Sequence, residues 1–213
     1  MTQTPKAGTA PTKRTRLSAT VRRQYILDAA LDEFSISGFE GATVEHIARK
    51  AGITKAGLYA HFTSKEAVFE ALLDTIMLPT MSDDGWALSS EESLESAVDS
   101  FLGVLYGGTR SPRRLSIIRL LLIESGRNPH RIQQWYQQTY QPYIQKRQQV
   151  LENYLRQHTS HTSLTSGQIA LAFSPAVLAM FWQMIIGGES AASEIAAIKK
   201  SHRDVMLRLL SPD

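Results

Sequence analysis

One short stretch of the chain combines hydrogen-bond donors with side chains small enough to allow close approach to another molecule. The donors are Lys55, Tyr59 and His61, and the small residues between them are Ala56, Gly57 and Ala60. Such donors suit phosphate oxygens, and an alanine methyl group can touch the methyl group of thymine. The stretch therefore predicts a surface that contacts double-stranded DNA. The alternative is a helical packing unit whose outer surface has no binding role.

Two short helices joined by a turn are predicted to position these side chains. Thr43 is a suitable N-cap for the first helix and Thr54 for the second, and both are expected beside the DNA. Gly52 ends the first helix because it can adopt the left-handed conformation of a tight turn. This pattern is typical of a helix-turn-helix, which places its second helix in the major groove. The apolar residues expected to pack the two helices together are Val44, Ile47, Ala48, Ala51, Ile53, Leu58 and Phe62.

Residues 26–73 resemble the N-terminal domain of the tetracycline-repressor (TetR/AcrR) family of bacterial regulators. The matching pieces, in chain order, are IL-AA---F---GF, T-V--IA--AG, LY-HF and SKE. Beyond them, the chain resembles the family in its length and its helical layout. It departs from the family at Gly57 and Ala60, where many members carry a larger polar side chain. The resemblance implies a DNA-binding domain followed by a larger domain that binds a small molecule and a second subunit.

Composition and charge limit the classes of function. Cysteine is absent from the 213 residues, which excludes disulfides, thiolate nucleophiles and Cys-ligated zinc sites. Residues 1–65 contain ten Lys or Arg and five Asp or Glu, whereas residues 66–213 contain 13 and 15. This asymmetry is typical of a nucleic-acid-binding end. No uncharged apolar run reaches the roughly 18 residues that span a bilayer, so we expect a cytoplasmic protein with no membrane partner.

The two ends of the chain are expected to differ in order and in function. Residues 1–17 lack apolar periodicity and are rich in Thr, Pro, Ala and Gly, which predicts a disordered basic tail. By the resemblance, Arg14 and Arg16 could contact the DNA from this tail, and Arg suits the minor groove. The alternative is a tail that only aids solubility. A helix-turn-helix DNA-binding domain is expected over residues 18–65, and a ligand-binding and dimerisation domain over residues 66–213.

Hydrophobic periodicity predicts an all-α fold of about nine helices, with no alternating pattern of the kind that forms strands. Thr63 and Glu66 fit a capping box at the start of the fourth helix, which would bring Lys65 close to a phosphate. By the resemblance, this helix also joins the two domains. The later helices are expected at residues 91–106, 112–125, 129–158, 166–187 and 193–210.

Aromatic residues recur on successive turns of three of these later helices, as they do in the walls of small-molecule pockets. The candidates are Phe101, Tyr106, Trp135, Tyr136, Tyr140, Phe173, Phe181 and Trp182. Arg119 and Glu124 lie on a largely apolar helix and could orient a polar ligand. The alternative for the aromatic residues is a packed core. For the two charged residues, it is a helix edge in contact with water or with each other.

Apolar residues of the last two helices predict a contact with a second copy of the chain. On the last helix they recur at alternating three- and four-residue steps, which suits packing across an interface. The preceding helix is apolar on almost every side and needs cover on each side. The alternative is a helix buried inside a monomer. The predicted interface consists of Val177, Phe181, Met184, Ile195, Ile198, His202, Val205 and Leu209.

The sequence does not suggest catalysis, a metal site or a resident cofactor. Neither a nucleophile with a base nor a pair of carboxylates stands out, and His158 and His161 lie in a polar loop with no carboxylate nearby. We therefore expect a non-enzymatic, homodimeric transcriptional regulator, namely a repressor that a small-molecule effector releases from a palindromic operator. An activator whose ligand favours DNA binding is the alternative within this class. The alternative from another class is a helical small-molecule carrier whose helix-turn-helix is only structural.

Overall fold

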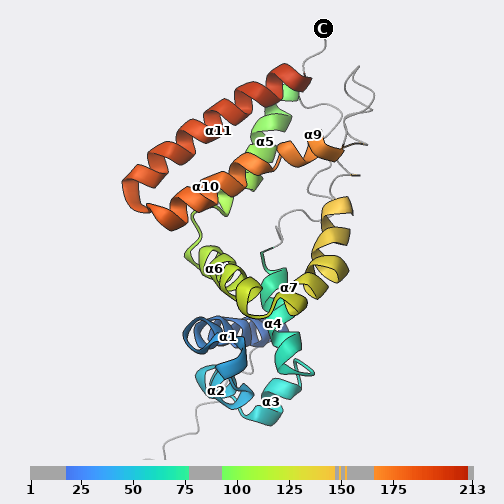
Figure 1. Ribbon diagram of the computed structural model, residues 1–213, viewed down its shortest axis with the longest axis vertical. Helices are drawn as coiled ribbons and strands as arrows, with labels where there is room; N and C mark the ends of the chain where they lie inside the picture. The colour runs from blue at the N-terminus through green and yellow to red at the C-terminus, as the bar shows by residue number, and fades with distance from the viewer. Residues whose placement is uncertain (1–17, 77–92, 147–148, 150–151, 153–165, 211–213) are drawn as a thin grey trace, which may run out of the picture.

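The computed structural model of the chain describes residues 18–76, 93–146, 149, 152 and 166–210 (Figure 1). All regular structure within these ranges is helical, which confirms the predicted all-α class. None of the described helices contains a stretch long and apolar enough to cross a membrane. The helices are α1 (Ala19–Gly41), α2 (Val44–Lys50), α3 (Lys55–Tyr59), α4 (Lys65–Asp74), α5 (Leu94–Gly107), α6 (Pro112–Arg127), α7 (Pro129–Trp135), the π-helical turn η1 (Tyr136–Tyr140), α9 (Ser166–Leu171), α10 (Ser174–Ile185) and α11 (Gly188–Leu210).

Side-chain hydroxyl groups begin many of these helices by accepting a hydrogen bond from the backbone N–H three residues ahead. The predicted caps Thr43 and Thr54 are confirmed. The predicted cap Thr63 is wrong, because the Ser64 hydroxyl begins α4 by accepting from the Ala67 N–H at 3.1 Å. Among the described residues, the hydroxyl groups that cap a helix in this way belong to Ser18, Thr43, Thr54, Ser64, Ser93 and Ser111.

A first hydrophobic core holds the N-terminal helices together and continues into later ones. Phe34 and Phe39 of α1 and Phe69 of α4 form an aromatic cluster, with ring centroids 5.1 to 5.7 Å apart. Leu120 of α6 and Trp135 of α7 belong to the same core. The packing is therefore continuous from α1 and α4 into α6 and α7. A movement of α6 would consequently displace side chains that pack against α1 and α4.

A second core lies at the opposite end of the molecule (Figure 1). Helices α10 and α11 form an antiparallel pair, and α5 packs against both. Ala179 of α10 and Ala191 of α11 are fully buried, and Leu102 of α5 is buried with them. Small residues in these positions allow the helices to approach closely. The long, regular pair α10–α11 forms one outer surface of the molecule.

Two helix boundaries predicted for the C-terminal part were wrong. The helix expected over residues 166–187 is two helices, because Pro175 lies in the first turn of α10. Proline is tolerated there since the first backbone N–H groups of a helix have no partner within it. Helix α11 begins at Gly188 rather than near residue 193. It follows Gly187, whose φ of 65° lies in the left-handed region that glycine adopts readily.

Candidate nucleic-acid interface

The turn between α2 and α3 is determined by a glycine and by backbone hydrogen bonds. Gly52 has a φ of 68°, which a residue with a side chain adopts only at a cost. The Ile53 N–H donates to the Ala48 carbonyl at 3.0 Å, which closes the turn. Leu58 of α3 and Ile47 of α2 are fully buried in the same core. These contacts orient α3 against α2 as the predicted helix-turn-helix requires.

The side of α3 opposite Leu58 faces solvent, at the end of the molecule far from α11 (Figure 1). The Thr54 hydroxyl accepts from the Gly57 N–H at 3.0 Å, and the Thr43 hydroxyl accepts from the His46 N–H at 3.2 Å. Each hydroxyl keeps its own O–H as a donor. The structure therefore gathers the predicted contact residues of α3 on one outer surface. The exposed residues are Thr54, Lys55, Ala56, Tyr59 and Ala60, and the half-buried ones are Gly57 and His61.

Lys55 of α3 forms an ion pair with Glu45 of α2. The hydrogen bond lowers the pKa of the Glu45 carboxyl and raises the pKa of the Lys55 ammonium, so both groups are charged. Both side chains are exposed, and an exposed pair of this kind contributes little to stability. A DNA phosphate could therefore replace the carboxylate as the partner of Lys55.

Lys65 has a structural role that the sequence analysis did not anticipate. Its ammonium donates to the carbonyls of Phe39 at 2.7 Å, Glu40 at 3.4 Å and Ala42 at 3.0 Å. These acceptors use all three N–H groups of the ammonium. The side chain thereby closes the C-terminal end of α1, where the carbonyls carry partial negative charge. The phosphate contact expected of Lys65 stays a prediction.

Two further arginines lie in the helix-turn-helix region and were not singled out from the sequence. Arg49 is exposed near the end of α2, one turn before Gly52. The Arg23 guanidinium lies 3.9 Å from the centre of the Phe62 ring and donates to the His61 carbonyl at 2.9 Å. Arg23 thereby attaches α1 to the segment that follows α3. The predicted DNA contacts Arg14 and Arg16 lie outside the described residues.

Known proteins share both this motif and this fold. Residues 26–72 match the family described as bacterial regulatory proteins, tetR family. The chain is 34% identical over 112 residues to TtgW of Pseudomonas putida, an uncharacterized HTH-type transcriptional regulator, and the match covers 53% of this chain and 81% of TtgW. The chain belongs to the TetR family.

Another curated relative and a solved structure are also similar to this chain, over different shares of their length. SrpR, an HTH-type transcriptional regulator of Pseudomonas putida, is also 34% identical over 112 residues, but the match covers only 51% of its length. A crystal structure of a TetR-family protein from Mesorhizobium loti MAFF303099 covers 91% of this chain and 98% of its own, with a TM-score of 0.66 and 21% identity. That similarity extends the family fold beyond the helix-turn-helix. The two curated relatives are transcriptional regulators rather than enzymes.

In this TetR-family chain, α6 attaches the helix-turn-helix to the rest of the molecule. Glu124 is fully buried and accepts from the Phe39 N–H at 3.2 Å and from the Asn128 amide at 2.7 Å. At the start of α6, Arg113 pairs with Asp28 of α1 at 2.8 Å. The expectation that Glu124 orients a ligand is therefore wrong, because its oxygens are bound to groups of the protein itself.

The predicted ligand-binding residues separate into the two cores instead of forming one pocket. Trp135 lies in the first core, where its ring centre is 5.4 Å from that of Tyr140 and its Nε1 donates to Asp74 at 3.0 Å. The structure therefore does not bring all the predicted aromatic residues together in one place. The aromatic residues of the second core are Phe101, Tyr106 and Phe173.

The remaining predicted ligand residues lie on or near the surface. Arg119 is exposed and donates to the Met184 carbonyl at 3.4 Å, which joins α6 to the end of α10. Tyr136 and Phe181 are exposed, and Trp182 is half-buried. Arg119 therefore connects two helices of the chain, and the ligand roles of the other three residues stay predictions.

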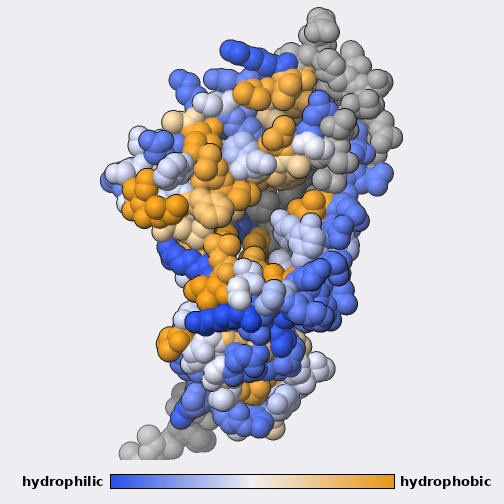
Figure 2. Space-filling model, in the orientation of Figure 1, coloured by the Kyte–Doolittle hydropathy of each residue, from blue (hydrophilic) through white to orange (hydrophobic). Residues whose placement is uncertain are grey.

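The outer faces of α10 and α11 expose apolar side chains (Figure 2). Four of the predicted interface residues lie on these faces, namely Val177, Phe181, Val205 and Leu209. A fifth, Met184, is half-buried. Ile195 and His202 are instead buried within the chain, and Ile198 packs against the second core. The prediction is wrong for Ile195 and His202, because α11 packs them against other helices of the same chain. Ile198 is half-buried, and its interface role stays a prediction. The exposed apolar residues are Val177, Leu178, Phe181, Ile185, Ile186, Val205 and Leu209.

Proposed function

We propose that this TetR-family protein is a homodimeric repressor that binds a palindromic operator and leaves it when a small molecule binds the C-terminal helices. The outer face of α3 carries the proposal, because Ala56 and Ala60 are exposed there beside Lys55 and Tyr59. Small side chains allow a helix to approach base edges, and the flanking donors suit phosphates. The regulator names of its relatives support the same assignment and disfavour a carrier protein.

A dimer would give this short recognition helix its specificity. One copy of α3 reaches one half-site, whereas two copies reach two half-sites about 34 Å apart, one turn of DNA. The exposed apolar faces of α10 and α11 support such a dimer, since large apolar patches on a soluble protein mark interaction sites. The basic excess of residues 1–65 favours association with the polyanion.

Helix α6 is the proposed route from the ligand to the DNA. It contacts α10 through Arg119, and it contacts α1 through Arg113 and Glu124. A shift of α6 would therefore move α1 and the helix-turn-helix with it. The ligand relieves repression if it binds the released state more tightly than the DNA-bound state. The opposite preference would make the ligand a co-repressor or the protein an activator.

A gel-shift assay with the DNA upstream of the gene tests this function. The wild-type protein should shift the fragment, and Ala56→Glu should weaken binding about 100-fold or more, because it forces a carboxylate against phosphates. Ala196→Glu is the matched control, since Ala196 is an exposed alanine of α11, and it should bind like the wild type. Normal binding by Ala56→Glu would mean that α3 does not face DNA through this side. If the wild-type protein bound no DNA, the carrier alternative would be favoured.

A further inference from the structure

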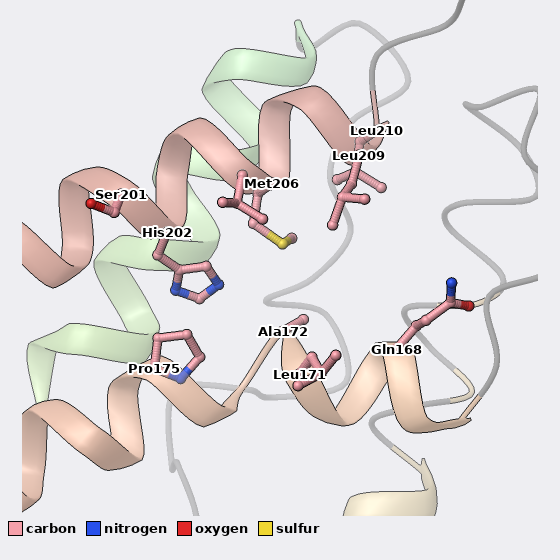
Figure 3. Close-up of a pocket in the computed structure, with 10 residues that line it drawn as sticks. Gln168, Leu171, Ala172, Pro175, Ser201, His202, Met206, Leu209 and Leu210 are labelled. Atoms are coloured by element: carbon pink, nitrogen blue, oxygen red, sulfur yellow. The ribbon is translucent and has the colours of Figure 1, made fainter.

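A cavity of about 470 Å³ lies between α9, the start of α10 and the C-terminal half of α11 (Figure 3). Most of its wall is apolar, and Leu171 and Met206 project into it. The volume falls in the range of sites that bind small organic molecules. None of the ligand residues expected from the sequence lines this cavity. Three of the expected dimer residues do, namely His202, Val205 and Leu209.

Among the described residues of this wall, His202 is a polar side chain that is almost completely buried. The residue is only 5% exposed, and its Nδ1 lies 3.2 Å from the Tyr106 hydroxyl. Its Nε2 is also buried, and no described residue is hydrogen-bonded to it. In Figure 3 the ring extends from α11 into the cavity, toward Pro175. Because a buried polar atom without a partner is costly, Nε2 indicates a position that a bound molecule would complete.

The contact with Tyr106 determines what Nε2 offers to such a molecule. The phenol has one proton to donate, and His202 Nδ1 is the one hydrogen-bond partner that the described residues provide for it. If Nδ1–H donated instead, both the phenol O–H and the Nε2 lone pair would lack a partner among the described residues, whereas donation by the hydroxyl leaves only one group unpaired. Donation by the hydroxyl is therefore favoured, and it places the proton of a neutral imidazole on Nε2. Burial lowers the pKa of His202, which keeps the ring neutral. His202 consequently contributes one N–H donor to the cavity.

We propose that this cavity binds an uncharged small molecule with an apolar body and one hydrogen-bond acceptor, such as a carbonyl oxygen, which receives the Nε2–H of His202. Among the described residues, no Lys or Arg lines the cavity, so a carboxylate or phosphate would lose its water without gaining a counter-charge from them. Apolar side chains from a second copy, such as Phe181 or Ile185, would fill the space but leave the N–H unpaired. The donor therefore favours a small molecule over a protein partner.

The chemistry of this cavity gives the class of small molecule to which the proposed effector belongs. Only the effect of that molecule on DNA binding rests on the proposed function. Helices α10 and α11 both border the cavity, and both carry the exposed apolar face of the proposed dimer. A molecule bound between them would alter the relative positions of α10 and α11. Its effect would reach the partner subunit directly and reach α6 through the contact of Arg119 with α10.

Two matched probes test the acceptor requirement. The ketone 1-phenylbutan-1-one and the hydrocarbon butylbenzene share a carbon skeleton and differ at the carbonyl group. Each is titrated into the full-length protein without DNA and followed by NMR, and nitrogen–proton correlation identifies the His202 tautomer. We expect the Nε2–H tautomer in the free protein and a dissociation constant about tenfold lower for the ketone. His202→Phe should abolish this preference, and His130→Phe, at an exposed histidine of α7, should retain it.

Several outcomes would overturn the proposal. These are an Nδ1–H tautomer, equal affinity of the wild-type protein for both probes, and an unchanged preference in His202→Phe. Probe binding that occurs only in dissociated protein would assign the cavity to a second copy. The tautomer measurement uses the wild-type protein, so it tests whether His202 offers an Nε2–H donor even if His202→Phe fails to fold. The probe titration contains no DNA, so a negative result in it would not contradict the proposed repressor function. Likewise, a protein that failed to bind the operator would not contradict the proposed ligand site.

Discussion

The Lys65 ammonium donates to three backbone carbonyls where α1 ends, and losing these hydrogen bonds should lower stability. Lys65→Met keeps an unbranched side chain but removes the three donors. We expect the free energy of unfolding, measured by urea denaturation, to fall by about 2 kcal/mol. Lys200→Met, on the exposed side of α11, should change it by less than about 0.5 kcal/mol. A stable Lys65→Met protein whose DNA affinity depended less steeply on salt would instead indicate a phosphate contact.

His202 should make the protein less stable on mild acidification. Burial lowers its pKa below the ordinary value of 6.5, so the unfolded chain binds the proton at a higher pH than the folded protein does. Between the two pKa values the unfolded state carries more protons, and the free energy of unfolding therefore falls as the pH falls below about 6.5. Urea unfolding at pH 7.5 and 5.5 measures this difference. His202→Phe should reduce this difference in the free energy of unfolding, and His130→Phe should not. An equal difference in the wild-type protein and both variants would contradict the assignment of the pH dependence to His202.

At the scale of elements, the bend near the end of α1 depends on a glycine. Gly38 has φ 68° and ψ 173°, a combination that is essentially restricted to glycine. A Cβ there would also lie 3.3 Å from the Glu124 carboxylate that binds the Phe39 N–H. Gly38→Ala should lower the free energy of unfolding by about 2 kcal/mol. The matched control is Gly41→Ala in the same helix, where φ is ordinary and the nearest contact is 3.4 Å; thermal unfolding of both variants compares them, and equal losses would refute the conformational argument.

The helices that the sequence predicts best are those whose signals are local. The caps Thr43 and Thr54 were confirmed because each bonds to an N–H only three residues ahead. The role of Ile195 was not predictable in the same way, because its spacing fits a contact within the chain as well as a contact between copies. Phe101 and Trp135 share an aromatic character but lie in different cores. Sequence spacing shows which residues share a helix face, whereas long-range packing decides which faces meet.

At the scale of the whole molecule, the candidate DNA surface and the candidate dimer surface lie at opposite ends. The outer face of α3 is at one end, and the exposed apolar residues of α10 and α11 are at the other (Figures 1 and 2). The two surfaces use different helices and different side chains. A substitution at the apolar end therefore leaves the helix-turn-helix chemically unchanged, and any loss of DNA binding that it causes reports on assembly.

The dimer is tested by placing charges on α10. Phe181 is 40% exposed and Ile185 is 71% exposed, and neither lines the cavity beside His202. Phe181→Asp combined with Ile185→Asp would bury unpaired carboxylates in the contact, so the subunits should dissociate. Operator affinity should then fall about 100-fold or more, because a monomer loses the effective concentration that links two half-sites. Ile36→Asp is the control, since Ile36 is 79% exposed on α1, and it should stay dimeric.

Light scattering and a gel shift on the same sample separate the possible causes of lost binding. A monomer that binds weakly supports assembly through α10 and α11. If the doubly substituted protein remained dimeric, the interface would lie on other helices. If it became monomeric and still bound the full operator tightly, each copy of α3 would be sufficient alone, and the two-half-site mechanism would be wrong. The predicted weak binding of a monomer follows from the small size of α3, whose five residues (Lys55–Tyr59) can touch only a few bases.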